Sequence, residues 1–170
     1  MRRSLTVFEM RVDEFNALPA DDARALVAGW LGVRRWVDEV VAGRPYSDTD
    51  ELRRQAHDSA LDLTDHELAS ALSRHPRIGE RPSGGGAESR HSRSEQAGVR
   101  AADAERLRAA NAAYEQRFGH VFLVRAAGRT SADILAELRR RLYNDEETER
   151  AETVTALRDI ALLRMGEVVR

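Results

Sequence analysis

The chain has 170 residues and a formal net charge of -2, and this length predicts a single domain spanning residues 1–170. Charged residues make up 33% of the chain and aromatic residues 5%, a balance that favours a helical domain over a β-sandwich. The near equality of 27 basic and 29 acidic residues argues against nucleic acid or an anionic membrane as a partner.

Two missing residue types exclude whole classes of chemistry. Without cysteine, the chain has no disulfides, no thiolate nucleophile and no cysteine-type metal site. Without lysine, it has no side-chain amine for a Schiff-base mechanism. No stretch approaches the ~20 apolar residues of a membrane span, and the first residues lack a secretory signal pattern. We therefore expect a soluble, cytoplasmic protein.

Apolar residues recur at helical spacing in both halves of the chain, which predicts an all-α fold. In the N-terminal half we expect helices at residues 12–18, 20–31, 34–41, 48–60 and 65–74. In the C-terminal half we expect helices at residues 94–117, 131–143 and 146–168. The predicted architecture is a single-domain bundle of about eight helices with a long central active-site loop.

Several helix ends are marked by residues with a clear physical role. Gly43 followed by a proline predicts one stop, and Gly119 predicts another. Thr64 with Glu67 three residues later is typical of a capping box. Either Thr130 or Ser131 is expected to cap the penultimate helix.

Two further features concern what is buried. The apolar run at residues 121–124 is too short for a helix, so we expect a lone extended segment beneath the helices. The last helix is expected to turn Ala151, Val154 and Leu157 inward. On the same helix, Arg164 follows two leucines, which suggests a guanidinium that points inward toward an anionic partner.

The central segment, residues 75–96, lacks a helical apolar period and is rich in polar groups. His75 lies where Pro76 forces a helix to stop, so its imidazole is a candidate general acid, general base or anion anchor. The alternative is a histidine that only satisfies carbonyls at a helix end. Glu95 stands at the start of a helix, as a functional carboxylate or as a simple dipole partner.

Common motifs for metals and phosphate are incomplete. His66 and Glu67 begin an HExxH pattern, but residue 70 is serine, so the zinc interpretation fails. The triple glycine at residues 84–86 lacks the GK[ST] ending of a phosphate loop and is better explained as a hinge. The sequence therefore predicts no metal site.

The motif HPRIG at residues 75–79, followed by Glu95-Gln96, resembles the 2-oxo-4-hydroxy-4-carboxy-5-ureidoimidazoline (OHCU) decarboxylase family. The likeness extends over most of the chain. It includes the Leu-Pro-Ala sequence at residues 18–20, the pattern NxxYxxRFG at residues 111–119, and the C-terminal pattern IxxLR at residues 160–164.

This resemblance implies a helical bundle, a homodimer and a reaction without a cofactor. The reaction would be decarboxylation of OHCU, a small molecule, to (S)-allantoin in urate degradation. By the same resemblance, His75 and Glu95 would be the catalytic pair. The implied substrate-binding residues are Pro76, Ser92, Arg93, Ser94, Gln96, Phe122, Leu123, Val124, Arg125, Ala126 and Arg164.

Two departures from the family pattern leave alternatives open. His120-Val121 stands where the family often has Phe-Pro, and Arg125 replaces a small residue or a cysteine. A relative acting on another ureido or carboxylated heterocycle is one alternative, and a non-catalytic helical adapter is another. Retention of the catalytic pair and of Arg164 argues against the adapter.

Overall fold

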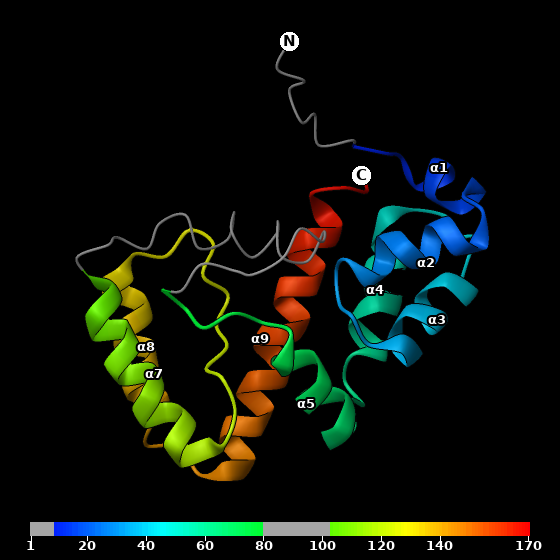
Figure 1. Cartoon of the computed structure of the whole chain (residues 1–170). Coiled ribbons are helices and arrows are strands. Elements are labelled where there is room, and N and C mark those ends of the chain that lie inside the picture. Colours follow the sequence, from blue (N-terminus) through cyan, green and yellow to red (C-terminus); the bar gives the residue numbers. More distant parts are fainter. Residues whose placement is uncertain (1–8, 80–102) are drawn as a thin grey trace. The chain divides into compact units, whose positions relative to one another are not determined.

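The computed structural model of the chain describes residues 9–79 and 103–170, and these residues form eight helices (Figure 1). No strand is found within these ranges, where a single isolated bridge pairs Met10 with Val169. The all-α prediction is confirmed. The helices are α1 (Val12–Ala17), α2 (Ala20–Ala28), α3 (Arg34–Ala42), α4 (Thr49–Ser59), α5 (Asp65–Ser73), α7 (Ala104–Phe118), α8 (Ser131–Arg141) and α9 (Glu146–Gly166).

The chain divides into two compact units, and α9 contributes residues to both. The first unit is formed by Met1–Asp62 with Ile160–Arg170, and the second by Leu63–Asp159. The first therefore holds α1 to α4, and the second holds α5, α7 and α8. None of the helices that the structure describes has the length and apolar character needed to cross a membrane.

In the first unit, polar groups of large side chains donate hydrogen bonds to backbone carbonyls. The Trp36 indole on α3 is fully buried and donates to the carbonyl of Ala56 on α4 at 2.9 Å. Arg44, just after α3, donates to the carbonyls of Phe15 and Leu18 at 3.0 and 2.8 Å. These bonds bring side-chain donors to carbonyls near the ends of the short helices.

In the second unit, one apolar cluster joins α7 and α8 to the chain on either side of α7. Its buried members are Ile78, Leu107, Tyr114, Phe122, Val124, Ala126, Ile134 and Leu138. Residues 121–126 lie between α7 and α8 and contain no helical turn, and we call them the extended segment. Their apolar side chains at 122, 123 and 124 are buried, as the sequence predicted.

The predicted helix ends are confirmed where local chemistry decides them. Gly43 and Gly119 are the C-caps of α3 and α7, and Gly119 adopts the left-handed conformation with φ 77°. Thr64 forms the complete capping box with Glu67, and Thr130 caps α8. The helix expected from residue 94 begins at Ala104 in the described residues, and residues 94–102 lie outside them.

One inward face was predicted wrongly. Ala151 on α9 is exposed, whereas its neighbours Glu149 and Thr153 are buried. The helix is turned toward these polar residues because both bind Arg141 of α8. A buried ion pair, which apolar periodicity does not detect, therefore sets the rotation of α9 at this point.

A second arginine on α8 sets the acid stability of the α8–α9 contact. Arg140 binds Glu137 of its own helix at 2.7 Å, and it also binds Glu152 of α9. These hydrogen bonds favour the ionised carboxylates and hold the pKa of Glu137 and of Glu152 below the usual value of 4.5. Because the folded-state pKa is depressed, this stabilisation is complete above 4.5 and is lost as the pH falls through the folded-state pKa.

We therefore expect the free energy of unfolding to decrease as the pH falls below about 5, with a smaller decrease in the Glu152→Gln variant. Urea unfolding at a series of pH values measures this difference. Glu147→Gln, which changes an exposed glutamate of the same helix, is the matched control. Equal pH dependence in the wild type and Glu152→Gln would contradict the role of the Arg140 contact.

Candidate functional site

His75 is held at the C-terminal end of α5. Its backbone N–H donates to the carbonyl of Leu72 at 3.1 Å, and its imidazole Nδ1 lies 3.0 Å from the carbonyl of Ala71. A carbonyl only accepts, so Nδ1 must carry the hydrogen. In the neutral ring, Nε2 then carries the lone pair. The side chain is 7% exposed, so its position is fixed by its surroundings.

The residues after His75 are fastened to α7 by three kinds of contact. Arg77 forms a two-point ion pair with Glu115, at 2.5 and 3.0 Å. The carbonyl of Ile78 accepts a hydrogen bond from Asn111 Nδ2 at 2.8 Å, and the Ile78 side chain joins the apolar cluster. We call residues 75–79 the histidine motif. Its sequence, HPRIG, thus has a structural reason at its third and fourth positions.

Gly79 ends the histidine motif in a conformation that suits glycine. Its φ is +88°, and a Cβ atom built on it would lie 3.5 Å from Cβ of Leu107 on α7. Residues with a side chain rarely adopt this φ, so glycine occupies this position at low cost. The described residues stop here and resume at Asp103.

The extended segment packs into the same cluster as the histidine motif. Phe122, Val124 and Ala126 belong to the cluster that contains Ile78. This alternation is typical of an extended chain, with every second side chain on one face. Arg125 lies between them in sequence and is exposed. Of the predicted site residues, His75, Pro76 and residues 122–126 therefore come from two segments that share one core.

The sequence did not predict the ionic network behind the extended segment. Arg141 and Glu149 are 2% and 1% exposed, and they form an ion pair in which Nε and Nη2 of the arginine donate to Oε1 at 3.0 and 2.5 Å. Tyr114 of α7 also donates to this carboxylate. Burial, and secondarily the bond to Glu149, raises the pKa of the Tyr114 phenol above its usual value. Arg141 follows Leu138 by three residues and so lies on the inward face of α8. This spacing is the feature of the sequence that indicates its burial.

Arg164 is buried as predicted, and it lies in the first unit. Its guanidinium is 0% exposed, and Nη1 donates to the carbonyl of Trp30 at 3.3 Å. The other predicted site residues lie outside the described part of the chain, so their roles remain predictions. They are Ser92, Arg93, Ser94, Glu95 and Gln96.

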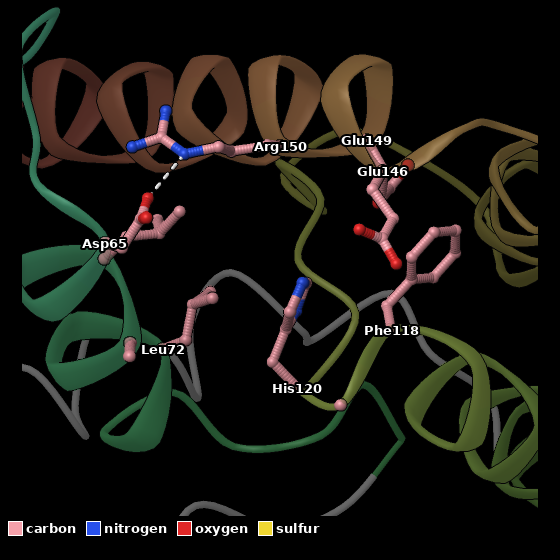
Figure 2. A pocket seen from close by; sticks show the side chains of 10 residues that line it. Asp65, Leu72, Phe118, His120, Glu146, Glu149 and Arg150 are labelled. Carbon is pink, nitrogen blue, oxygen red and sulfur yellow. Dashed lines mark hydrogen bonds and ion pairs between the residues drawn. The ribbon is translucent and has the colours of Figure 1, made fainter.

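A cleft of about 410 Å³ in the second unit is formed by a different set of residues. It lies among α5, the end of α7 and the start of α9. Figure 2 shows His120 pointing into the space between Leu72 and Phe118, with the Arg150–Asp65 ion pair of 2.8 Å nearby. Neither His75 nor residues 122–126 line this cleft. It is therefore not the place where the two segments of the candidate site meet.

Metal ligands do not gather in residues 9–79 and 103–170. Within these ranges no group of three or more histidine, aspartate or glutamate side chains has a geometry suited to a metal ion. What the two segments offer is a buried imidazole with a defined tautomer and a stretch of backbone donors and acceptors. This combination suits proton transfer and the binding of a polar small molecule.

Two polar contacts of the histidine motif are expected to contribute differently to the free energy of unfolding. Asn111→Ala should leave the buried carbonyl of Ile78 without its donor and lower the free energy of unfolding by about 1–3 kcal/mol. Arg77→Gln removes a partly exposed ion pair and should cost less than about 1 kcal/mol. Urea unfolding measures both, and an Asn111→Ala variant as stable as the wild type would show that this bond does not hold the motif.

Comparison with known proteins identifies the family. The family model described as OHCU decarboxylase matches residues 16–166. A 2-oxo-4-hydroxy-4-carboxy-5-ureidoimidazoline decarboxylase of Amia calva is 29% identical over 136 residues, covering 77% of this chain and 78% of the relative. The uric acid degradation bifunctional protein of Bacillus sp. (strain TB-90) is 25% identical over 167 residues, which cover 95% of this chain. The alignment spans only 32% of that longer protein.

The fold has a counterpart among solved structures. An OHCU decarboxylase crystallised in the presence of (S)-allantoin superposes with a TM-score of 0.71 at 24% identity, covering 84% of this chain and 96% of the other. At this identity the likeness concerns the fold alone. The family match covers nearly the whole chain, and with it the histidine motif and the extended segment. The chain belongs to the OHCU decarboxylase family.

Proposed function

We propose that this chain decarboxylates OHCU to (S)-allantoin in urate degradation, with His75 acting on the substrate. The family assignment supports the reaction, and the setting of His75 supports its role. The observation that supports this role is the bond from Nδ1 to the Ala71 carbonyl, because it leaves Nε2 as the basic nitrogen of the neutral ring.

The substrate makes such a simple site sufficient. Its carboxylate and hydroxyl are both on C4, next to C5, which carries the ureido group and a double bond to the ring nitrogen. Loss of CO₂ leaves an electron pair that delocalises from C4 toward C5 and that nitrogen. A proton then returns to C5 while the 4-hydroxyl becomes a carbonyl. The ring itself accepts the electrons, so the protein needs only to bind, orient and move protons.

The roles proposed for the individual residues rest on the family resemblance. His75 interacts with the 4-hydroxyl or the leaving carboxylate, and Glu95 orients it or the ring nitrogens. Arg164 holds a substrate oxygen or carboxylate, as the resemblance implies. Pro76, together with the residues at 92–94, 96 and 122–126, lines the substrate. Delivery of the proton to one face of C5 produces the (S) enantiomer.

A coupled assay tests the reaction. Urate is converted in situ to the unstable substrate by the two upstream enzymes, this chain is added, and optically active allantoin is followed by circular dichroism. We expect faster appearance of the (S) signal than in the spontaneous reaction. Absence of any acceleration would reject the proposed function and favour an adapter or a different substrate.

Within that assay, two variants of His75 separate its chemical role from its structural role. His75→Asn keeps a donor close to the position of Nδ1, so the bond to Ala71 can persist while the basic nitrogen is lost. We expect His75→Asn and His75→Ala each to reduce kcat by at least about 100-fold, the usual size of general acid–base catalysis. Their far-ultraviolet circular dichroism should match that of the wild type.

The matched control is His57→Asn, which changes a more exposed histidine on α4 that is hydrogen-bonded to Asp58. This variant should retain wild-type turnover. Near-normal kcat in His75→Asn would refute the assignment of His75, even if the wild type is fully active.

Two finer points belong to the proposal as well. We propose that the chain works as a homodimer and in the cytoplasm, because the resemblance implies the first and the sequence pattern suggests the second. Light scattering on the purified chain tests the first, where a mass of one 19.0 kDa protomer would contradict it.

A further inference from the structure

The extended segment has no neighbouring strand in the part of the chain that the structure describes. Its backbone N–H and C=O groups therefore cannot be satisfied by a sheet ladder, and buried groups of this kind need other partners. The carbonyl of Ala126 accepts from the backbone N–H of Arg129 in the following turn at 3.0 Å, and side chains of adjacent helices are the other kind of protein partner. The segment is thus held in place by side chains rather than by repeating backbone bonds.

Arg141 supplies such a contact from α8. Its Nη1 donates to the carbonyl of Leu123 at 2.6 Å, and its guanidinium carbon lies 4.8 Å from the centre of the Phe122 ring. One side chain therefore holds a carbonyl of the segment and stacks on the aromatic ring beside it. Both contacts use the planar shape of the guanidinium, which lysine does not have.

Arg141 is itself held on its other edge. Glu149 accepts from its Nε and Nη2, and Thr153 accepts from Nη2 at 3.0 Å. The Glu149 carboxylate also accepts from Tyr114 and from Asn144 Nδ2, the latter at 2.9 Å. With Glu149 and Thr153 of α9 on one edge and the extended segment on the other, the guanidinium has little freedom to move. Its hold on the Leu123 carbonyl is therefore set by the packing of three helices.

We propose that Arg141 is a positioning residue for the reaction, which it serves by fixing the extended segment against the substrate. This inference rests on the proposed function. In an extended chain, the N–H and C=O of one residue point to one edge and those of the next residue point to the other. Fastening Leu123 to Arg141 therefore commits the backbone groups of Phe122 and Val124 to the opposite edge, where they bind the substrate.

The test compares Arg141→Lys with Arg140→Lys, its neighbour on the same helix. Arg140 is half-exposed and forms ion pairs with Glu137 and Glu152, which lie outside the extended segment. Each variant keeps its positive charge. We expect Arg141→Lys to raise KM at least about tenfold and to lower the enantiomeric excess of (S)-allantoin, because a loosened segment binds the substrate less firmly and in more than one orientation. Arg140→Lys should keep wild-type values.

Hydrogen exchange gives a readout that does not depend on turnover. Amides of residues 121–126 should exchange faster in Arg141→Lys, while those in the middle of α7 keep their protection. If Arg141→Lys does not fold, Tyr114→Phe replaces it, since this change removes one bond to Glu149 and leaves the ion pair. It should shift KM and exchange in the same direction by a smaller factor.

The outcomes separate the two proposals. An inactive wild type overturns the proposed function. The positioning role alone is overturned if the wild type is active and the folded variant behaves like it. The variant is Arg141→Lys or Tyr114→Phe, and the quantities compared are KM, enantiomeric excess and hydrogen exchange at residues 121–126. A loss of stability with unchanged KM and enantiomeric excess in the remaining folded protein also overturns it, because a structural role alone explains that result.

Discussion

The second unit depends on one buried ion pair, between Arg141 and Glu149. Removing two charges from water is costly, and the cost is offset only when both ions are fully hydrogen-bonded. Here Tyr114 and Asn144 donate further hydrogen bonds to the carboxylate. The guanidinium donates to the carbonyl of Leu123 and to the hydroxyl of Thr153. Loss of one partner from such a pair typically costs about 3–5 kcal/mol. The pair therefore links the rotation of α9, the packing of α7 and α8, and the path of the extended segment.

A second polar contact holds the candidate site on the same apolar core. Ile78 enters the same apolar cluster as Phe122 and Val124, and Asn111 holds its carbonyl. The chain around His75 and the extended segment are both irregular backbone. Neither has the repeating hydrogen bonds that keep a helix rigid. Each is fixed by a polar side chain from α7 or α8. Catalysis that consists of orienting a substrate and moving a proton benefits from this rigidity, because small misplacements reduce the rate strongly.

The parts of the fold that local chemistry decides were predictable. Helix ends at Gly119 and Thr64 follow from conformational preference and capping, and His75 was located by the proline after it. The buried pair was not predictable, because Arg141 and Glu149 lie on different helices and charged residues usually face solvent. For the same reason Ala151 was wrongly placed inward. Glu95 lies outside the described residues, so its pairing with His75 remains a prediction from resemblance.

The most direct test of the account is a crystal structure of this chain soaked with (S)-allantoin, the product of the proposed reaction. We predict that the product lies within hydrogen-bonding distance of His75 Nε2 and of backbone groups of Phe122 or Val124, with the Leu123 carbonyl still bound to Arg141. Allantoin in the cleft lined by His120 and Arg150, with no contact to His75 or the extended segment, would contradict it.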